Sequence, residues 1–146
     1  MSSIPATRYR VTRHTPSAIN RAIQDKIAAN IQFHSNNPEL IDRRLKELDD
    51  EWDIERAIEM NAAALAFLGT SLGAAHNKKW LALPLLVTGF LFQHAIQGWC
   101  PPIPILRRMG FRTAQEIEQE RYGLLALSKL KLKSSQPVEN SVRKAA

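Results

Sequence analysis

The chain has 146 residues, enough for one ordinary domain, and its 20 Lys and Arg residues outnumber its 14 Asp and Glu residues, giving a net charge of +6. The single cysteine, Cys100, excludes an internal disulfide and any metal site built from several cysteines. Because the N-terminal stretch MSSIPATRYR has no apolar core, we expect no secretory signal peptide.

The N-terminal region is polar and is predicted to be helical after a short arm. Residues 1–14 are basic and unpatterned, and we expect a flexible arm there. Thr15 and Pro16 are typical of a helix start, and residues 15–56 are predicted to form amphipathic cytoplasmic helices. Their apolar residues recur at helical spacing in two stripes, Ile19, Ile23, Ile27 and Ile31, then Ile41, Leu45, Leu48 and Trp52. These helices pack on each other or, alternatively, lie on a membrane or a partner subunit.

Two long segments without charge follow, and only Lys78 and Lys79 interrupt them. Met60–Asn77 has 18 residues and Trp80–Leu106 has 27 residues without Lys, Arg, Asp or Glu. Eighteen helical residues span roughly 27 Å, close to the thickness of a bilayer core. No helix-breaking signal separates Trp52 from the first segment, so we expect the preceding helix to run into it.

The second segment has the marks of a membrane-spanning helix. Trp80 and Trp99 lie roughly 28 Å apart along a helix, which suits one interfacial tryptophan at each end. The stretch WLALPLLVTGFLF has no polar face, and a helix that is apolar all round lies in lipid or in a large core. We therefore predict an all-α membrane protein with a two-span hairpin over residues 57–106. A soluble bundle with an apolar central hairpin is the alternative.

The distribution of charge predicts the orientation of this hairpin. The turn carries two basic residues, whereas eight flank the membrane segments on the side of the termini: Arg43, Arg44, Lys46, Arg56, Arg107, Arg108, Arg112 and Arg121. Basic residues accumulate on the cytoplasmic side of membrane proteins. We therefore expect both termini in the cytoplasm, with Arg107 and Arg108 meeting anionic headgroups.

The C-terminal region is predicted to add one cytoplasmic helix, within residues 107–132. Thr113 and Glu116 have the spacing of a capping box, so the helix should begin at residue 114. Residues 133–146 are polar and basic, and we expect a disordered tail.

Small residues in the first membrane segment indicate close helix packing. Gly69 and Gly73 form a GxxxG pattern, which Ala62 and Ala66 extend toward the start of the segment. The stripe packs either against the second span of the same hairpin or against a second copy of the chain. The pattern does not decide between these two arrangements.

Polar residues gather where the second span ends. Gln93, His94 and Gln97 lie in its last turns and could bond neighbouring helices or form a polar vestibule for a small anion or a proton. Cys100 follows, either as a small residue in the turn or as a thiol that nearby basic groups make reactive. His94 and Cys100 are too few to hold zinc. With no phosphate loop and no catalytic pattern, we expect no metal, no cofactor and no enzymatic activity.

The sequence GWCPPIPILRRMGFRT at the end of the hairpin resembles the YgaP-like inner-membrane domain family, whose function is largely unknown. The segments NPELIDRRLKELDDEWDIERAIEMNAA and RTAQEIEQERYGLLAL extend the resemblance over roughly residues 35–130. Within it, the family motif corresponds to Gly98, Cys100 and Pro101. The resemblance implies a multi-pass protein of the bacterial inner membrane that forms a dimer. It implies no reaction, because the chain lacks a rhodanese domain and a second cysteine.

These observations lead to one main hypothesis and two alternatives. The main hypothesis is a non-enzymatic membrane module, homodimeric through its first span, whose cytoplasmic helices dock a protein partner. The first alternative is a sulfur-linked or small-anion role, in which Cys100 accepts a persulfide or lines a path beside the vestibule. The second is a soluble basic helical protein that binds nucleic acid, which the apolar block disfavours.

Overall fold

The computed structural model describes residues 9–135, and every regular element in that range is helical, with no strand. This confirms the predicted all-α class. The described chain divides into two compact units. One unit contains residues 9–23 and 52–115 and includes the hairpin, whereas the other contains residues 24–51 and 116–135.

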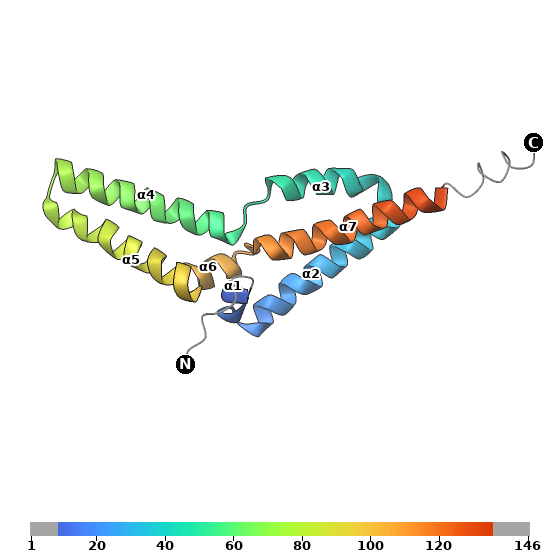
Figure 1. Ribbon diagram of the computed structural model, residues 1–146, viewed down its shortest axis with the longest axis horizontal. Coiled ribbons are helices and arrows are strands. Elements are labelled where there is room, and N and C mark those ends of the chain that lie inside the picture. Colours follow the sequence, from blue (N-terminus) through green and yellow to red (C-terminus); the bar gives the residue numbers. More distant parts are fainter. Residues whose placement is uncertain (1–8, 136–146) are drawn as a thin grey trace, which may run out of the picture. The chain divides into compact units, whose positions relative to one another are not determined.

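The hairpin consists of two antiparallel helices that run side by side, α4 (Ile54–Ala75) and α5 (Ala82–Gln97) (Figure 1). The short 3-10 helix η3 (Lys78–Leu81) connects them and contains the two lysines that interrupt the apolar block. The side chain of Asp53 caps the start of α4 by accepting a hydrogen bond from the backbone N–H of Arg56 at 2.8 Å.

Glycines bring the two helices together near the connecting turn. A Cβ atom at Gly69 would lie 2.5 Å from Cδ of Pro84, and a Cβ atom at Gly73 would lie 2.5 Å from Cδ2 of Leu81. Both glycines are buried, and Ala62 and Ala66 are half-buried. The glycine contacts support packing within one hairpin. Gly69 and Gly73 are therefore not available as the contact surface of the predicted homodimer.

Two short helices close the other end of this unit. These are α1 (Arg10–Arg13) and α6 (Ile103–Arg108). Together with the start of α4 they form an apolar core of Val11, Ile54, Ala57, Ile58, Cys100, Ile103 and Leu106. The prediction of an unpatterned arm over residues 1–14 is therefore wrong for its described part, because Val11 is buried in this core. Residues 1–8 lie outside the described range.

Arg107 is part of the interior, contrary to the expectation that it meets headgroups. Its side chain is 1 % exposed and donates hydrogen bonds to Oδ1 of Asn20 at 2.8 Å and to the carbonyl oxygen of Phe111 at 3.1 Å. A buried guanidinium group needs such acceptors, because desolvation without them is costly. Arg108 is exposed, as predicted for both arginines.

The helix before the apolar segment does not continue into it, contrary to our expectation. Helix α3 (Ile41–Asp50) ends at Glu51, whose backbone is extended, and α4 starts anew at Ile54. The backbone N–H of Ile54 donates to the carbonyl oxygen of Arg112 at 2.8 Å. This partner lies far along the chain, so the bond cannot be predicted from the sequence, whereas the N-cap residue Asp53 is a local signal for the new start.

The second unit packs α3 against parts of α2 (Ser17–Asn36) and α7 (Ala114–Ser135), with the 3-10 helix η2 (Pro38–Leu40) before α3. Its core consists of Ile41, Leu48, Ile117 and Leu124. Helix α7 starts at the predicted residue and continues past residue 132. The rest of the predicted tail, 136–146, lies outside the described residues.

A buried carboxylate ties these three helices together. Glu120 of α7 is fully buried and accepts hydrogen bonds from Nδ2 of Asn30 at 3.1 Å and from Nε of Arg44 at 2.8 Å. Asn30 lies on α2 and Arg44 on α3. Because a charged hydrogen bond restricts geometry more than apolar contact does, this carboxylate fixes how the three helices meet.

We predict that Gly69→Ala destabilises the hairpin whereas Gly89→Ala does not. The added methyl group at position 69 meets the rigid ring of Pro84, and such overpacking costs about 1–3 kcal/mol. At Gly89 nothing lies within 4 Å, so the helix preference of alanine should slightly stabilise the protein. Thermal unfolding of both variants in detergent, followed by circular dichroism, measures the difference. Equal midpoints would contradict the close approach at Gly69.

Candidate functional site

Glu55, in the first turn of α4, is the centre of a polar cluster at the end of the hairpin opposite the turn. Its Oε2 atom lies 2.7 Å from Nε2 of His94 on α5. Its Oε1 atom accepts from Nε and Nη2 of Arg10 on α1, at 3.3 and 3.1 Å. One carboxylate therefore links three helices, its own α4 with α1 and α5.

His94 is almost completely enclosed, with 4 % of its surface exposed. Its Nδ1 atom has no hydrogen-bond partner within the part of the chain that the structure describes. A buried N–H without an acceptor is costlier than a lone pair without a donor. We therefore assign the proton to Nε2, from which it is donated to Glu55.

The last turn of α5 is held against α1 by two further contacts. Nε2 of His14 lies 3.1 Å from the carbonyl oxygen of Gln97. Gly98 ends the helix with a positive φ of 76°, and a Cβ atom there would collide with the side chain of Arg10. Only glycine satisfies both the left-handed backbone and this close approach.

The predicted vestibule does not come together as one set of three residues. Nε2 of Gln93 and Oε1 of Gln97 are 3.5 Å apart, at the limit of a hydrogen bond, and Gln97 is exposed. His94 pairs with Glu55 instead. The three residues are therefore divided between a glutamine pair and the hydrogen bond of His94 to Glu55, and this arrangement provides no common polar chamber.

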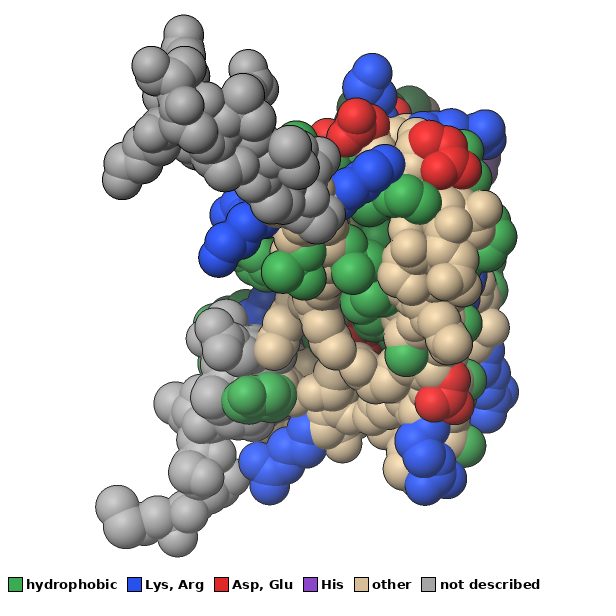
Figure 2. All heavy atoms as spheres, turned by 90° about the vertical axis from the view of Figure 1, so that its right-hand side faces the viewer, with side chains coloured by type: hydrophobic (Ala, Val, Ile, Leu, Met, Phe, Trp, Pro, Cys, Tyr) green, Lys and Arg blue, Asp and Glu red, His purple; other side chains and the backbone are tan. Residues whose placement is uncertain are grey.

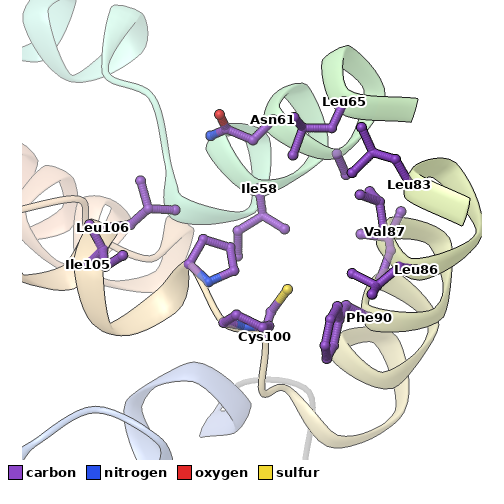
Figure 3. A pocket seen from close by; sticks show the side chains of 14 residues that line it. Ile58, Asn61, Leu65, Leu83, Leu86, Val87, Phe90, Cys100, Ile105 and Leu106 are labelled. Atoms are coloured by element: carbon purple, nitrogen blue, oxygen red, sulfur yellow. The ribbon is translucent and has the colours of Figure 1, made fainter. Parts of the chain in front are cut away.

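Beside the cluster, an apolar pocket of about 450 Å³ lies between the two helices of the hairpin (Figure 3). Residues 58–65 of α4 and 83–91 of α5 provide two walls, and residues 100–106 close the end. Every lining side chain is apolar except those of Asn61 and Cys100. The sulfur atom of Cys100 points into the space that also faces Ile58 and Phe90.

Cys100 is buried, with 5 % of its surface exposed, and burial raises the pKa of its thiol. Removal from water disfavours the thiolate, and no neighbouring charge offsets this effect. The hypothesis of a thiol activated by nearby arginines is therefore not supported. Arg107, the basic residue expected to act on it, is bonded to Asn20 and Phe111.

Pro101, the third residue of the predicted motif of Gly98, Cys100 and Pro101, lines the pocket with an exposed ring. The motif thus combines a helix-ending glycine, a small buried side chain and a proline that prevents the helix from continuing. Each of these roles is structural.

Sequence reasoning missed Glu55 as the partner of His94. It also missed Arg10, which bonds Glu55, and His14, which contacts the carbonyl oxygen of Gln97. Glu55 belongs to the acidic run DDEWDIE, which resembles a solvated helix face, and the two basic residues lie in the supposed arm. Glu55 lies three residues before Ile58 and seven before Ala62, so helical spacing places all three on one face of α4. This shared face was the signal in the sequence that Glu55 points toward the interior.

The comparisons with known proteins identify no relative. No family model, no curated protein and no solved structure matches the chain. Within residues 9–135, no three His, Cys, Asp or Glu side chains group as metal ligands would. The site is therefore defined by its geometry alone.

We predict that Glu55→Ala destabilises the first unit by about 2 kcal/mol, because it removes charged hydrogen bonds to Arg10 and His94. Glu59→Ala, one turn further along the same helix at an exposed position, is the matched control and should have little effect. Chemical unfolding in detergent, followed by tryptophan fluorescence, compares the two. If both variants match the unchanged protein, the cluster does not hold the three helices together.

We also predict that Cys100 is alkylated more slowly at neutral pH than an exposed cysteine placed at Met109. The raised pKa lowers its thiolate fraction, so its rate should keep increasing with pH after the exposed thiol has levelled off. The measurement is the rate of iodoacetamide modification between about pH 7 and 10, by mass spectrometry, in single-cysteine variants. A rate at pH 7 above that of the Met109→Cys control would restore the case for a reactive thiol.

Proposed function

We propose that the protein is a small integral membrane module, in which α4 and α5 cross the bilayer as a hairpin and the other helices lie in the cytoplasm. Two helical stretches, Pro38–Ala75 and Lys78–Gln97, are long and apolar enough to cross a membrane. The first includes the charged helix α3, so its apolar part is α4.

The observation that carries this proposal is the exposure of large apolar side chains along both helices. Phe67 on α4 is 73 % exposed, and Leu85 and Phe92 on α5 are 75 % and 70 % exposed. The apolar windows are only 22 % and 6 % buried, whereas the core helix of a soluble protein is mostly buried. Contiguous apolar surface of this kind needs lipid or a large partner.

The polar groups of the first unit lie where a spanning hairpin requires them. His76, Asn77, Lys78 and Lys79 occupy the turn, and the Glu55 cluster occupies the opposite end. Between these positions, from Met60 to Phe92, only the turn carries charge. A bilayer core placed over the helical parts of this stretch, with the turn outside it, would contain no charged side chain, as its low dielectric demands.

The second unit supports a docking role in the cytoplasm. In Figure 2, basic and acidic side chains share one face with hydrophobic ones. Phe33, Tyr122 and Leu130 contribute large apolar groups that are more than half exposed. Mixed surfaces with aromatic and charged groups suit protein partners, and the resemblance to the YgaP-like family fits a membrane module that performs no reaction itself.

The test is the topology of the hairpin in cells. In a Cys100→Ser background, Asn77→Cys should react with a membrane-impermeant maleimide added outside intact cells. Lys129→Cys, at an exposed position of α7, should react only after the cells are opened. This pattern follows from the excess of arginine on the side of the termini.

Two results would overturn the proposal. Recovery of the protein in the soluble fraction would show that the apolar faces are covered by protein rather than lipid. Labelling of Lys129→Cys in intact cells, with Asn77→Cys silent, would reverse the orientation.

A further inference from the structure

The pocket between α4 and α5 follows from an asymmetry of the hairpin. At the turn, α4 approaches the second half of the hairpin closely, because Gly69 faces Pro84 and Gly73 faces Leu81 with no side chain between them. At the other end, α6 and the residues before it lie between the helix ends, and Figure 1 shows α4 and α5 separating toward it. The pocket occupies the region of separation.

We propose that this pocket holds one acyl chain of an anionic phospholipid from the surrounding bilayer, an inference that rests on the proposed membrane function. The walls extend over eight residues of α4, 58–65, and nine of α5, 83–91. This corresponds to a slot roughly 10–12 Å long, which suits part of an extended acyl chain.

The chemistry of the lining excludes charged and strongly polar occupants. No lining residue is charged, so an ion would lose its hydration without compensation. The amide of Asn61 is already engaged, since its Nδ2 donates to the carbonyl oxygen of Ala57 at 2.8 Å. Water is also disfavoured, because apolar cavities with few polar partners stay dry.

An acyl chain can enter the pocket from the side without leaving the hydrocarbon. The lining residues Leu65, Leu86 and Ile105 are themselves exposed, so the pocket is continuous with the apolar outer faces of the hairpin. If a space of about 450 Å³ stayed empty, the side chains that line it would lose van der Waals contacts. Occupation by an apolar molecule is therefore favoured, and in a bilayer acyl chains are the apolar molecules at highest concentration.

Two exposed arginines favour an anionic headgroup. Arg56 lies two residues before Ile58, the first lining residue, and Arg108 lies two residues after Leu106, the last. Arg56 is held in place by its stacking on Trp52, with the guanidinium carbon 4.3 Å from the ring centroid. Both belong to the end of the hairpin where headgroups would lie.

The test uses the purified full-length chain in detergent, with phosphatidylglycerol as the probe. Since the Cys100 sulfur points into the pocket, a bound chain covers it. We expect phosphatidylglycerol to slow alkylation of Cys100 by N-ethylmaleimide about tenfold, with saturation at one lipid per chain in native mass spectra. Phosphatidylcholine should require a higher concentration for the same protection, because its headgroup has no net charge.

Matched variants separate the pocket from the outer surface. Ala62→Phe places a ring in the pocket and should abolish lipid retention, whereas Ala63→Phe adds the same ring at an exposed position beside it. Val87→Phe and Leu85→Phe form a second such pair on α5, should Ala62→Phe misfold.

Three outcomes contradict the inference: no retained lipid, a Cys100 rate that lipid leaves unchanged, or equal retention in both members of a pair. Dimers that protect Cys100 without lipid would also overturn it, since a second copy would then be the occupant. A protein that fractionates with membranes but retains no chain contradicts the pocket alone. A protein that never enters membranes contradicts the proposed function.

Discussion

The first unit depends on the hydrogen bonds that the carboxylate of Glu55 makes with other helices. In a bilayer, where we propose that the hairpin lies, no hydrophobic effect holds two helices together, so packing and hydrogen bonds must do so. Glycines provide packing at the turn. At the other end, Glu55 pairs with His94 across the hairpin and with Arg10 from α1. Without this carboxylate, Arg10 and His94 would lose their shared hydrogen-bond partner, and α1 would lose its polar link to α4. The contact of His14 with the carbonyl oxygen of Gln97 on α5 would remain.

The same arrangement explains why a pocket exists at all. His94 and Glu55 fix the ends of the two helices, and α6 occupies the space between them with Ile103 and Leu106 in the core. The helices can therefore approach closely only at the glycines. Between the glycine contacts and α6, the side chains do not fill the gap, and two of those that line it, Ala62 and Cys100, are small. The pocket therefore results from a difference in helix separation, because α4 and α5 are held close together at the turn and farther apart at α6.

The membrane-like pattern, the helical class and the start of α7 could be predicted, because each depends on residues close together in the sequence. The break before Ile54 has a local signal in the N-cap residue Asp53, but the bond of the Ile54 N–H to the distant carbonyl of Arg112 could not be predicted. Burial of Val11 and Arg107 likewise depends on tertiary partners that periodicity does not reveal. The site was predicted only in its composition. His94 and Cys100 were identified, but their surroundings were inferred from sequence neighbours such as Arg107, which bonds elsewhere.

These surroundings change the interpretation of the Gly98, Cys100 and Pro101 motif. Gly98 is required by its positive φ and by the side chain of Arg10, neither of which involves sulfur chemistry. Cys100 contributes a small side chain at the wall of an apolar pocket, where burial raises its pKa and suppresses the thiolate. A cysteine in this position behaves as a small hydrophobic residue. The motif therefore specifies how helix α5 ends over a polar cluster and leaves an apolar space beside it, and this geometry accounts for all three residues without a reaction.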